Sequence, residues 1–269
     1  PCWWLWSLFP SSLLFFSFLS SLSPFPLPPP FPLPSFPSPL FFFLSSSLPL
    51  LAQTPDARCV IVRGAGEDAF AAGGDIEEFL TVRATVDDAV HYHDDLVAGA
   101  LEAIRSCALP TVAAIRGACI GGGLEIAGCC DIRIAGESAR FGAPINRLGF
   151  SMYPGEMAGL LALVGPAVVL EILLEGRILS AHEALHKGLL SRVVDDARVF
   201  DEAAACAARI CAGAPLVARW HKQWVRRLMN GAPLSAPEKR EAFDFLATAD
   251  YREGLDAFLN KRTPRFTGR

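Results

Sequence analysis

The chain has 269 residues, enough for one large domain or two small ones, and its 52% hydrophobic content favours a globular or membrane protein over a disordered one. Lys and Arg number 24 against 28 Asp and Glu, which gives a formal net charge of −4. Binding to a phosphate backbone requires an excess of basic residues, so this composition argues against nucleic acid as a partner.

The first part of the chain has a composition of its own. From Ser7 to Leu51 every residue is Phe, Ser, Leu or Pro, and the first charged residue is Asp56. We expect neither a signal peptide, which needs a cationic start, nor a membrane-spanning helix, which repeated prolines forbid. All four residue types are encoded by pyrimidine-only codons. We therefore interpret residues 1–52 as a translated pyrimidine-rich tract without packed structure, with a proline-rich linker as the alternative.

The remainder of the chain alternates predicted strands with predicted helices. Short β-branched runs followed by glycine indicate the strands, and apolar residues at helical spacing indicate the helices. Because strands that alternate with helices favour parallel pairing, we predict an α/β fold, with a core over 53–195 and a helical region over 196–269. The predicted order is strand 58–63, helix 82–107, strand 111–115, helix 124–130, strand 131–134, then mainly helices with one strand at 189–194.

Two glycine-rich loops each follow a predicted strand and lead into a predicted helix. They are AFAAGGDI at 69–76 and IGGGLE at 120–125. Glycine lets the backbone approach a ligand and direct its N–H groups outward, and a helix N-terminus adds positive potential there. Two such loops facing each other supply two N–H donors for a developing oxyanion, with Glu125 about one turn after Gly122. Structural glycines and a solvated Glu125 are the alternatives, although the neighbours of Glu125 are apolar.

Five motifs follow one another in order along the chain: FAAGGDI at 70–76, AAIRGACIGGGLEIA at 113–127, CDIRIA at 130–135, ARFGAP at 139–144 and REGLDAF at 252–258. Together they resemble the enoyl-CoA hydratase/isomerase (crotonase) family, from about Arg58 to the C-terminus. The resemblance implies a spiral of ββα units with C-terminal helices, assembled as a trimer or a dimer of trimers. It also implies an acyl-CoA thioester as substrate, with coenzyme A as part of that substrate and no other cofactor.

The resemblance further implies roles for individual residues. The backbone N–H groups of Gly74 and Gly122 are implied to form the oxyanion hole for the thioester carbonyl, and Glu125 to act as a catalytic acid or base. Phe258 and Lys261 are implied to lie near the CoA of a neighbouring subunit. The full set of implied binding residues is Ala72, Gly74, Asp75, Ile76, Gly121, Gly122, Pro144, Ile145, Phe258 and Lys261.

The sequence departs from the family pattern at two places. Hydratases of this family carry a second glutamate directly after the proline of the FGxP motif, where this chain has Ile145. Glu156 is near the position where some isomerases of the family carry their acid, although it is also a typical acidic residue in the first turn of a helix. The family's first strand and first helix are expected where the Phe/Ser/Leu/Pro tract stands, so we expect a core without them.

A zinc-peptidase pattern also occurs, in HEALH at 182–186. Ser180 and Glu183 form a capping-box pattern, which gives this Glu a structural role, and we expect no metal site. His91 and His93 lie on a charged helix face, and we expect both to be solvated. The eight cysteines form no C-x-x-C pair, which favours buried free thiols of a reducing cytoplasm over a disulfide framework.

Three functions remain open from the sequence. The leading one is an acyl-CoA lyase or isomerase of the cytoplasm, with hydration of an enoyl-CoA first and isomerisation second, as in the β-oxidation of fatty acids. The second is a damaged or non-catalytic family member that binds acyl-CoA poorly. The third is the zinc peptidase. We expect no nucleic-acid or membrane partner.

Overall fold

The structure is a computed structural model that describes residues 13–19, 39–54, 57–66, 68–229 and 231–269. Its strands form a five-stranded sheet, in the order β1-β2-β4-β6-β9, and a four-stranded sheet, in the order β3-β5-β7-β8. The strands are β1 (Leu13–Leu19), β2 (Ala57–Gly64), β3 (Ala69–Ala71), β4 (Thr111–Ile115), β5 (Ala118–Ile120), β6 (Ile132–Gly136), β7 (Arg140–Gly142), β8 (Leu179–Ser180) and β9 (Arg192–Val194).

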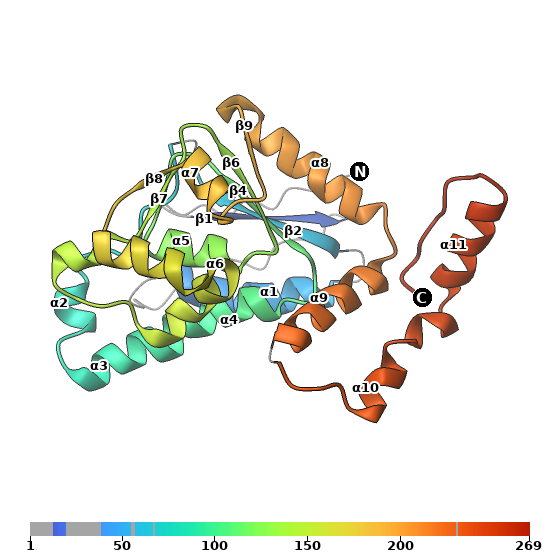
Figure 1. Cartoon of the computed structure of the whole chain (residues 1–269), viewed down its shortest axis with the longest axis horizontal. Helices are drawn as coiled ribbons and strands as arrows, with labels where there is room; N and C mark the ends of the chain where they lie inside the picture. The colour runs from blue at the N-terminus through green and yellow to red at the C-terminus, as the bar shows by residue number, and fades with distance from the viewer. Residues whose placement is uncertain (1–12, 20–38, 55–56, 67, 230) are drawn as a thin grey trace, which may run out of the picture.

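The helices flank the two sheets and extend beyond them at the C-terminal end (Figure 1). The α-helices are α1 (Pro39–Gln53), α2 (Phe79–Val82), α3 (Val86–Val90), α4 (Gly99–Ser106), α5 (Gly122–Cys129), α6 (Pro154–Glu175), α7 (Ala181–His186), α8 (Val199–Cys211), α9 (Pro215–Met229), α10 (Ala236–Glu241) and α11 (Ala249–Leu259). A π-helical segment, η1 (His91–Ala98), joins α3 to α4, and the 3-10 segments are η2 (Pro144–Leu148), η3 (Asp196–Arg198) and η4 (Asp244–Ala247).

The chain repeats a strand–strand–helix unit that places one strand in each sheet. β2, β4 and β6 lie side by side and parallel in the larger sheet, and each is followed by a short strand of the smaller sheet. Those short strands, β3, β5 and β7, are also parallel to one another. A helical segment follows each pair, so the repeat is the spiral of ββα units that the family resemblance implied, and the predicted α/β fold class is confirmed.

The hydrophobic core lies on both faces of the larger sheet. One buried cluster is shared by both sheets with α1, α4, α5 and α6, and the other lies between the larger sheet and α8. In the second cluster Val199, Ala203 and Cys206 of α8 pack against strand residues such as Ile61 and Val112. Because α8 completes this core, the predicted boundary at residue 195 lies one helix too early, and only α9 to α11 extend away from the sheets (Figure 1).

Part of the Phe/Ser/Leu/Pro tract is folded, which corrects the expectation of a core without its first strand and helix. The backbone of β1 pairs antiparallel with β2 at the edge of the larger sheet, from Leu13 opposite Gly64 to Leu19 opposite Ala57. In α1, Leu44 and Leu48 are four residues apart, lie on one face and are fully buried in the core. Tertiary packing thus overrides the weak helix propensity of a Ser- and Pro-rich segment. Residues 1–12 and 20–38 lie outside the described residues.

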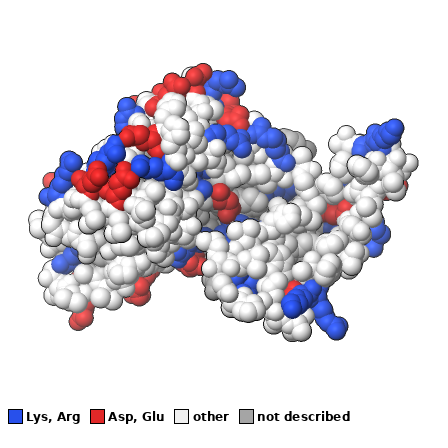
Figure 2. Space-filling view, in the orientation of Figure 1, with Lys and Arg blue, Asp and Glu red and all other residues white. Residues whose placement is uncertain are grey.

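One helix, α6, is long and apolar enough to cross a membrane by length and composition alone. It is broken at Gly165, whose φ of 72° and ψ of 174° are not helical, and Pro166 follows. It packs on α5 and η2, as a core helix of a globular protein does. Figure 2 shows a largely uncharged area over α6 beneath a band of intermixed acidic and basic side chains.

The cysteines of the described residues are free thiols, as the sequence predicted. Six of them are buried and Cys211 is half-buried, whereas Cys2 lies outside the described residues. Burial raises the pKa of both Cys129 and Cys130 to about 12. These two thiols are therefore protonated at neutral pH and contribute packing rather than nucleophilic chemistry.

Candidate active site

The structure brings the two glycine-rich loops together. β3 and β5 are parallel neighbours, so the loops that leave their carboxyl ends emerge at the same edge of the smaller sheet. A Cβ placed on Gly121 would lie 3.6 Å from the Cα of Gly73, so the two backbones are in contact. Gly73 has a φ of 103° and Gly121 a φ of 54°, conformations that favour glycine.

The glycines of the second loop, 121–123, have different structural environments. Gly123 is structural, because a Cβ there would lie 2.3 Å from the carbonyl oxygen of Ala71 and push α5 away from β3. Gly122 is the first residue of α5, where a backbone N–H has no partner within the helix and the helix dipole is positive. In the first loop, a Cβ on Gly74 would lie 3.2 Å from the ring of Phe79. The tight-packing interpretation therefore explains Gly123 but leaves the N–H of Gly122 available for a ligand.

A cavity of about 240 Å³ lies beside these loops, and both candidate acids line it. Of the residues that the sequence singled out, those on its wall are Ala72, Gly74, Ile76, Gly121, Gly122, Glu125, Pro144, Ile145 and Glu156. The remaining wall residues are Gly73, Phe79, Arg83, Tyr92, His93, Val97, Ile120, Leu148, Phe150, Ser151 and Met152.

Glu125 is a buried carboxyl group. It lies in the first turn of α5, and only 7% of its surface is exposed. Its pKa is raised to about 8, chiefly by burial and then by the charge of Glu156, while the charge of Arg83 opposes the rise. Glu125 therefore carries a proton at neutral pH, and the alternative of a solvated side chain is wrong.

Glu156 comes to the same cavity from α6. It occupies the first turn of that helix after Pro154 and Gly155, as a helix-capping acid would, yet it is only 5% exposed. Its Oε1 lies 2.5 Å from Nδ1 of His93. The cavity thus holds two buried carboxyl groups, one beside an imidazole and the other in an apolar wall.

The expectation that His93 is solvated is wrong. Its side chain is only 14% exposed, it lines the cavity and it stacks on Tyr153. His93, Val97 and Leu101 are spaced by four residues, which is a signal that His93 belongs to the apolar face of the helix. His91 is exposed and pairs with Asp95, in agreement with the prediction.

The sequence also did not reveal the aromatic wall of the cavity. The rings of Phe79 and Tyr92 are in edge contact at 6.0 Å, and those of Phe79 and Phe150 at 5.9 Å. Arg83, which follows α2, places its guanidinium carbon 3.4 Å from the centre of the Phe79 ring. These four residues come from three separate segments of the chain, so no local sequence motif predicts that they meet in one wall.

Three residues that the family resemblance placed at the binding site do not line this cavity. Asp75 is exposed, and its carboxylate accepts a hydrogen bond of 2.9 Å from the backbone N–H of Glu77. Phe258, in α11, is 82% exposed, and Lys261 is exposed just beyond that helix. Their predicted contacts with CoA remain predictions.

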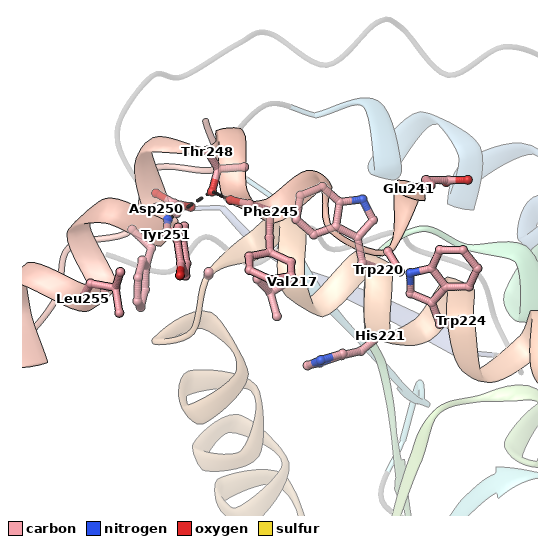
Figure 3. A pocket seen from close by; sticks show the side chains of 14 residues that line it. Val217, Trp220, His221, Trp224, Glu241, Phe245, Thr248, Asp250, Tyr251 and Leu255 are labelled. Atoms are coloured by element: carbon pink, nitrogen blue, oxygen red, sulfur yellow. Dashed lines mark hydrogen bonds between the residues drawn. The ribbon is translucent and has the colours of Figure 1, made fainter. Parts of the chain in front are cut away.

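A second hollow, of about 460 Å³, lies between α9 and the segment from α10 to α11 (Figure 3). Aromatic side chains dominate it, including Trp220 and Trp224 of α9. Its buried acid, Asp250, is used structurally, because its carboxylate accepts hydrogen bonds from the backbone N–H groups of Thr267 and Gly268. This hollow offers no paired glycine loops, so the cavity beside Glu125 is the candidate active site.

Comparison with known proteins identifies the family of the chain. The family profile described as enoyl-CoA hydratase/isomerase matches residues 30–269. The chain belongs to the enoyl-CoA hydratase/isomerase family. It is 36% identical to a probable enoyl-CoA hydratase of Mycobacterium bovis over 84% of this chain and 86% of that protein. A probable enoyl-CoA hydratase of Bacillus subtilis is 37% identical, with 84% of this chain and 87% of that protein covered.

Solved structures of family members match along most of their length. An enoyl-CoA hydratase/carnithine racemase from Magnetospirillum magneticum is 48% identical, with a TM-score of 0.84 and 86% of each chain covered. An enoyl-CoA hydratase from Bacillus anthracis is 31% identical, with a TM-score of 0.76, 86% of this chain and 89% of that chain covered. Membership of this enoyl-CoA hydratase/isomerase family supports an enzymatic function of the hydratase or isomerase type.

In this family member the zinc-peptidase pattern forms part of a helix start. Ser180 and Glu183 make the predicted capping box, and Arg177 also pairs with Glu183. These contacts lower the pKa of Glu183 to about 2, so its carboxylate is held as a capping anion. Within the described residues, no group of three or more His, Cys, Asp or Glu side chains is placed to hold a metal ion.

Proposed function

We propose that the protein hydrates a 2-enoyl-CoA thioester in the cavity between the glycine loops and α6. The thioester carbonyl accepts hydrogen bonds from the backbone N–H groups of Gly74 and Gly122, which stabilise the enolate oxygen as charge develops on it. The observation that carries this proposal is the presence of two buried carboxyl groups, Glu125 and Glu156, in the cavity beside those loops. Coenzyme A is part of the substrate, and no other cofactor is required.

The two acids take different parts in the reaction. Glu156, paired with His93, accepts a proton from a water molecule whose oxygen bonds to the β-carbon of the acyl group. The electrons of the double bond move to the thioester oxygen and form the enolate. Glu125, which holds a proton at neutral pH, then donates it to the α-carbon. The net change is the addition of one water, and proton exchange with solvent returns both acids to their starting states.

Isomerisation of a 3-enoyl-CoA is the second candidate. Ile145 stands where hydratases of the family carry their second acid, and Glu156 approaches the cavity from α6 instead. An acid in this position suits transfer of a proton along the acyl chain, a reaction that needs no bound water. The ratio of crotonyl-CoA hydration to 3-enoyl-CoA isomerisation in the wild-type protein decides which reaction is the principal one.

The role of Glu156 is tested by substitution and rescue. Glu156→Gln should lower hydration of crotonyl-CoA by about 100-fold or more, because a positioned acid–base group contributes about that much. Ile145→Glu in the same chain should restore part of the activity, whereas Ile145→Gln should not. Glu137→Gln, on an exposed turn, is the matched control for a loss of one carboxylate. A fully active Glu156→Gln variant would leave Glu125 as the sole acid and exclude the two-acid mechanism.

We further propose that the protein is a cytoplasmic homotrimer or hexamer that serves fatty acid β-oxidation. Ala72, Asp75 and Ile76 would line the entry for pantetheine, and Phe258 with Lys261 would approach the CoA of a neighbouring subunit. Large apolar side chains exposed on α6, α9 and α11 support an association of subunits. They are Leu161, Leu170, Leu174, Val225, Leu228, Met229, Leu255, Phe258 and Leu259. Light scattering of the purified protein gives the subunit number.

A further inference from the structure

Arg83 places a positive charge in the wall of the candidate active site. Its guanidinium carbon lies 3.4 Å from the centre of the Phe79 ring, 4.7 Å from that of Phe150 and 5.5 Å from that of Tyr92. Stacking on aromatic faces holds the planar guanidinium in place without using its N–H groups. The cation is thus fixed in orientation while its donors stay available.

The guanidinium has no hydrogen-bond acceptor from the protein. Within the described part of the chain, Arg83 makes no hydrogen bond or ion pair, and its Nε is buried without a partner. An arginine side chain has five N–H donors, and a buried donor without an acceptor is energetically costly. The Nη groups of Arg83 likewise have no partner among the described residues, and because Arg83 lines the cavity they can donate to a bound ligand.

Other buried arginine groups of the chain differ from Arg83. Arg133 donates to the backbone carbonyls of Leu189 and Cys130, which satisfy its guanidinium. Arg219 also has a buried Nε without a partner, but it lines neither of the two cavities. Within the described residues, Arg83 is the arginine that combines an unpartnered donor with a place on the wall of the active-site cavity.

The two catalytic acids are not substitutes for the missing acceptor. Glu125 and Glu156 are close enough to Arg83 to interact with its charge, yet neither accepts a hydrogen bond from it. Glu156 instead contacts His93, and Glu125 holds a proton at neutral pH. Neither acid therefore satisfies the guanidinium, and a ligand in the cavity that Arg83 lines can supply the acceptor.

We propose that Arg83 receives a carboxylate at the far end of the acyl group, so that the preferred substrate is the 2-enoyl-CoA of a short dicarboxylic acid. The proposal rests on the proposed function, because it places the thioester at Gly74 and Gly122. A guanidinium and a carboxylate form two parallel hydrogen bonds, a geometry that a neutral acyl chain cannot provide. A neutral chain offers no charged acceptor to the guanidinium, and a site that binds a polar group of its substrate discriminates against a ligand that lacks that group.

The dimensions of the cavity limit the length of the acyl group. Phe79 contacts both Gly74, where the thioester is placed, and Arg83, where the carboxylate is placed. Its ring is 3.2 Å from the Cβ position of Gly74, and the ring centre is 3.4 Å from the guanidinium carbon of Arg83. The cavity has a volume of about 240 Å³. A four- to six-carbon diacid, at about that scale, fits this space better than a long fatty acyl chain does.

The phosphates of CoA are the other possible anions for Arg83. They are attached through the long pantetheine arm, on the far side of the thioester from the acyl group. Arg83 instead lies beside the rings and acids of the cavity wall, within reach of the charges of Glu125 and Glu156. This placement favours the acyl carboxylate, and the two sources have different consequences when Arg83 is replaced.

The test compares two five-carbon substrates that differ only at the far end, glutaconyl-CoA with a carboxylate and 2-pentenoyl-CoA with a methyl group. The wild-type protein should show a kcat/KM at least about tenfold higher for glutaconyl-CoA, since a hydrogen-bonded charge typically contributes that much. Arg83→Met changes the surroundings of Glu125 for both substrates, so the ratio of the two kcat/KM values is the readout: the variant should lose the preference for glutaconyl-CoA, with a fall in kcat/KM at least about tenfold larger for glutaconyl-CoA than for 2-pentenoyl-CoA. Arg83→Lys keeps the charge but cannot form two parallel hydrogen bonds. Its kcat/KM for glutaconyl-CoA should therefore lie between those of the wild type and Arg83→Met.

Binding measurements separate this proposal from the proposed function. Dissociation constants of the unreactive glutaryl-CoA and pentanoyl-CoA need no catalysis, and calorimetry should show that Arg83→Met removes the preference for glutaryl-CoA. Arg147→Met, on the exposed part of η2, should leave the preference intact and serves as the matched control. If this preference is present in a protein that hydrates neither substrate, the carboxylate site stands and hydration is wrong.

Two results would overturn the carboxylate site. One is a wild-type protein that binds pentanoyl-CoA as tightly as glutaryl-CoA, a measurement that depends on no variant. The other is an equal loss for both ligands in a folded Arg83→Met protein, which would assign Arg83 to the CoA phosphates or to the catalytic acids.

Discussion

The stability of the protein should depend on pH through Glu125. Its pKa is about 8 in the folded chain, chiefly because of burial, against an ordinary value of 4.5. Between these two values the unfolded chain loses the proton while the folded chain keeps it. The folded state then binds more protons than the unfolded state, so the free energy of unfolding decreases as the pH rises through this range.

The magnitude follows from the size of the pKa difference. A rise of about 3.5 at about 1.4 kcal/mol per pKa unit corresponds to about 5 kcal/mol above pH 8. Glutamine resembles the protonated carboxyl group and does not ionise in the unfolded chain. Glu125→Gln should therefore match the wild type near pH 4.5, exceed its stability by about 3 kcal/mol at about pH 6.5, and approach the full difference above about pH 8.

Urea denaturation of both proteins at these three pH values measures the difference, at one protein concentration so that subunit association does not contribute. Glu137→Gln, at an exposed position, should show no comparable rise with pH. A stability difference that stays constant with pH would mean that Glu125 is ionised in the folded protein. The assignment of Glu125 as the proton donor would then be wrong, and the decline in wild-type kcat/KM expected above about pH 8 would also be absent.

The remaining predictions concern two neighbouring glycines and the first helix. Gly122→Val should reduce turnover by at least about 100-fold in a chain that still folds, because it displaces an oxyanion donor. Gly123→Ala should instead lower the denaturation midpoint, since the new Cβ would lie 2.3 Å from the oxygen of Ala71; an unchanged midpoint would mean that α5 can move away. Leu48→Ala should reduce the free energy of unfolding by about 2–5 kcal/mol, as expected for a fully buried leucine, and no loss would show that α1 does not contribute to the core.

The C-terminal helices show how a local pattern can be correct while its place in the fold is not. The helical spacing of 196–269 is real, and α8 to α11 lie within it. The sequence could not assign α8 to the core, because its apolar face of Val199, Ala203 and Cys206 is as compatible with a partner subunit as with a sheet. The partner of an amphipathic face is a tertiary property, and the larger sheet is that partner here.

The sequence by itself determined the elements whose signal is local. The glycine loops at 69–76 and 120–125 and the capping box of Ser180 and Glu183 each depend on residues close in the chain, and each was recognised from its spacing. The fold class followed from the alternation of strands and helices. The acid in the first turn of α5, Glu125, was identified for the same reason, because one turn separates it from Gly122.

Only the tertiary structure decided what surrounds these elements. Leu44 and Leu48 become core residues because α4 covers them, against the composition of their segment. His93 contacts Glu156, which lies 63 positions later in the chain, and the guanidinium of Arg83 lies over the ring of Phe150, which is also distant in sequence. Contacts of this kind leave no period or spacing in the sequence, since they depend on how the ββα units stack. The proton affinity of Glu125 and the charge of Arg83 in the candidate active site are therefore consequences of packing, which no local pattern records.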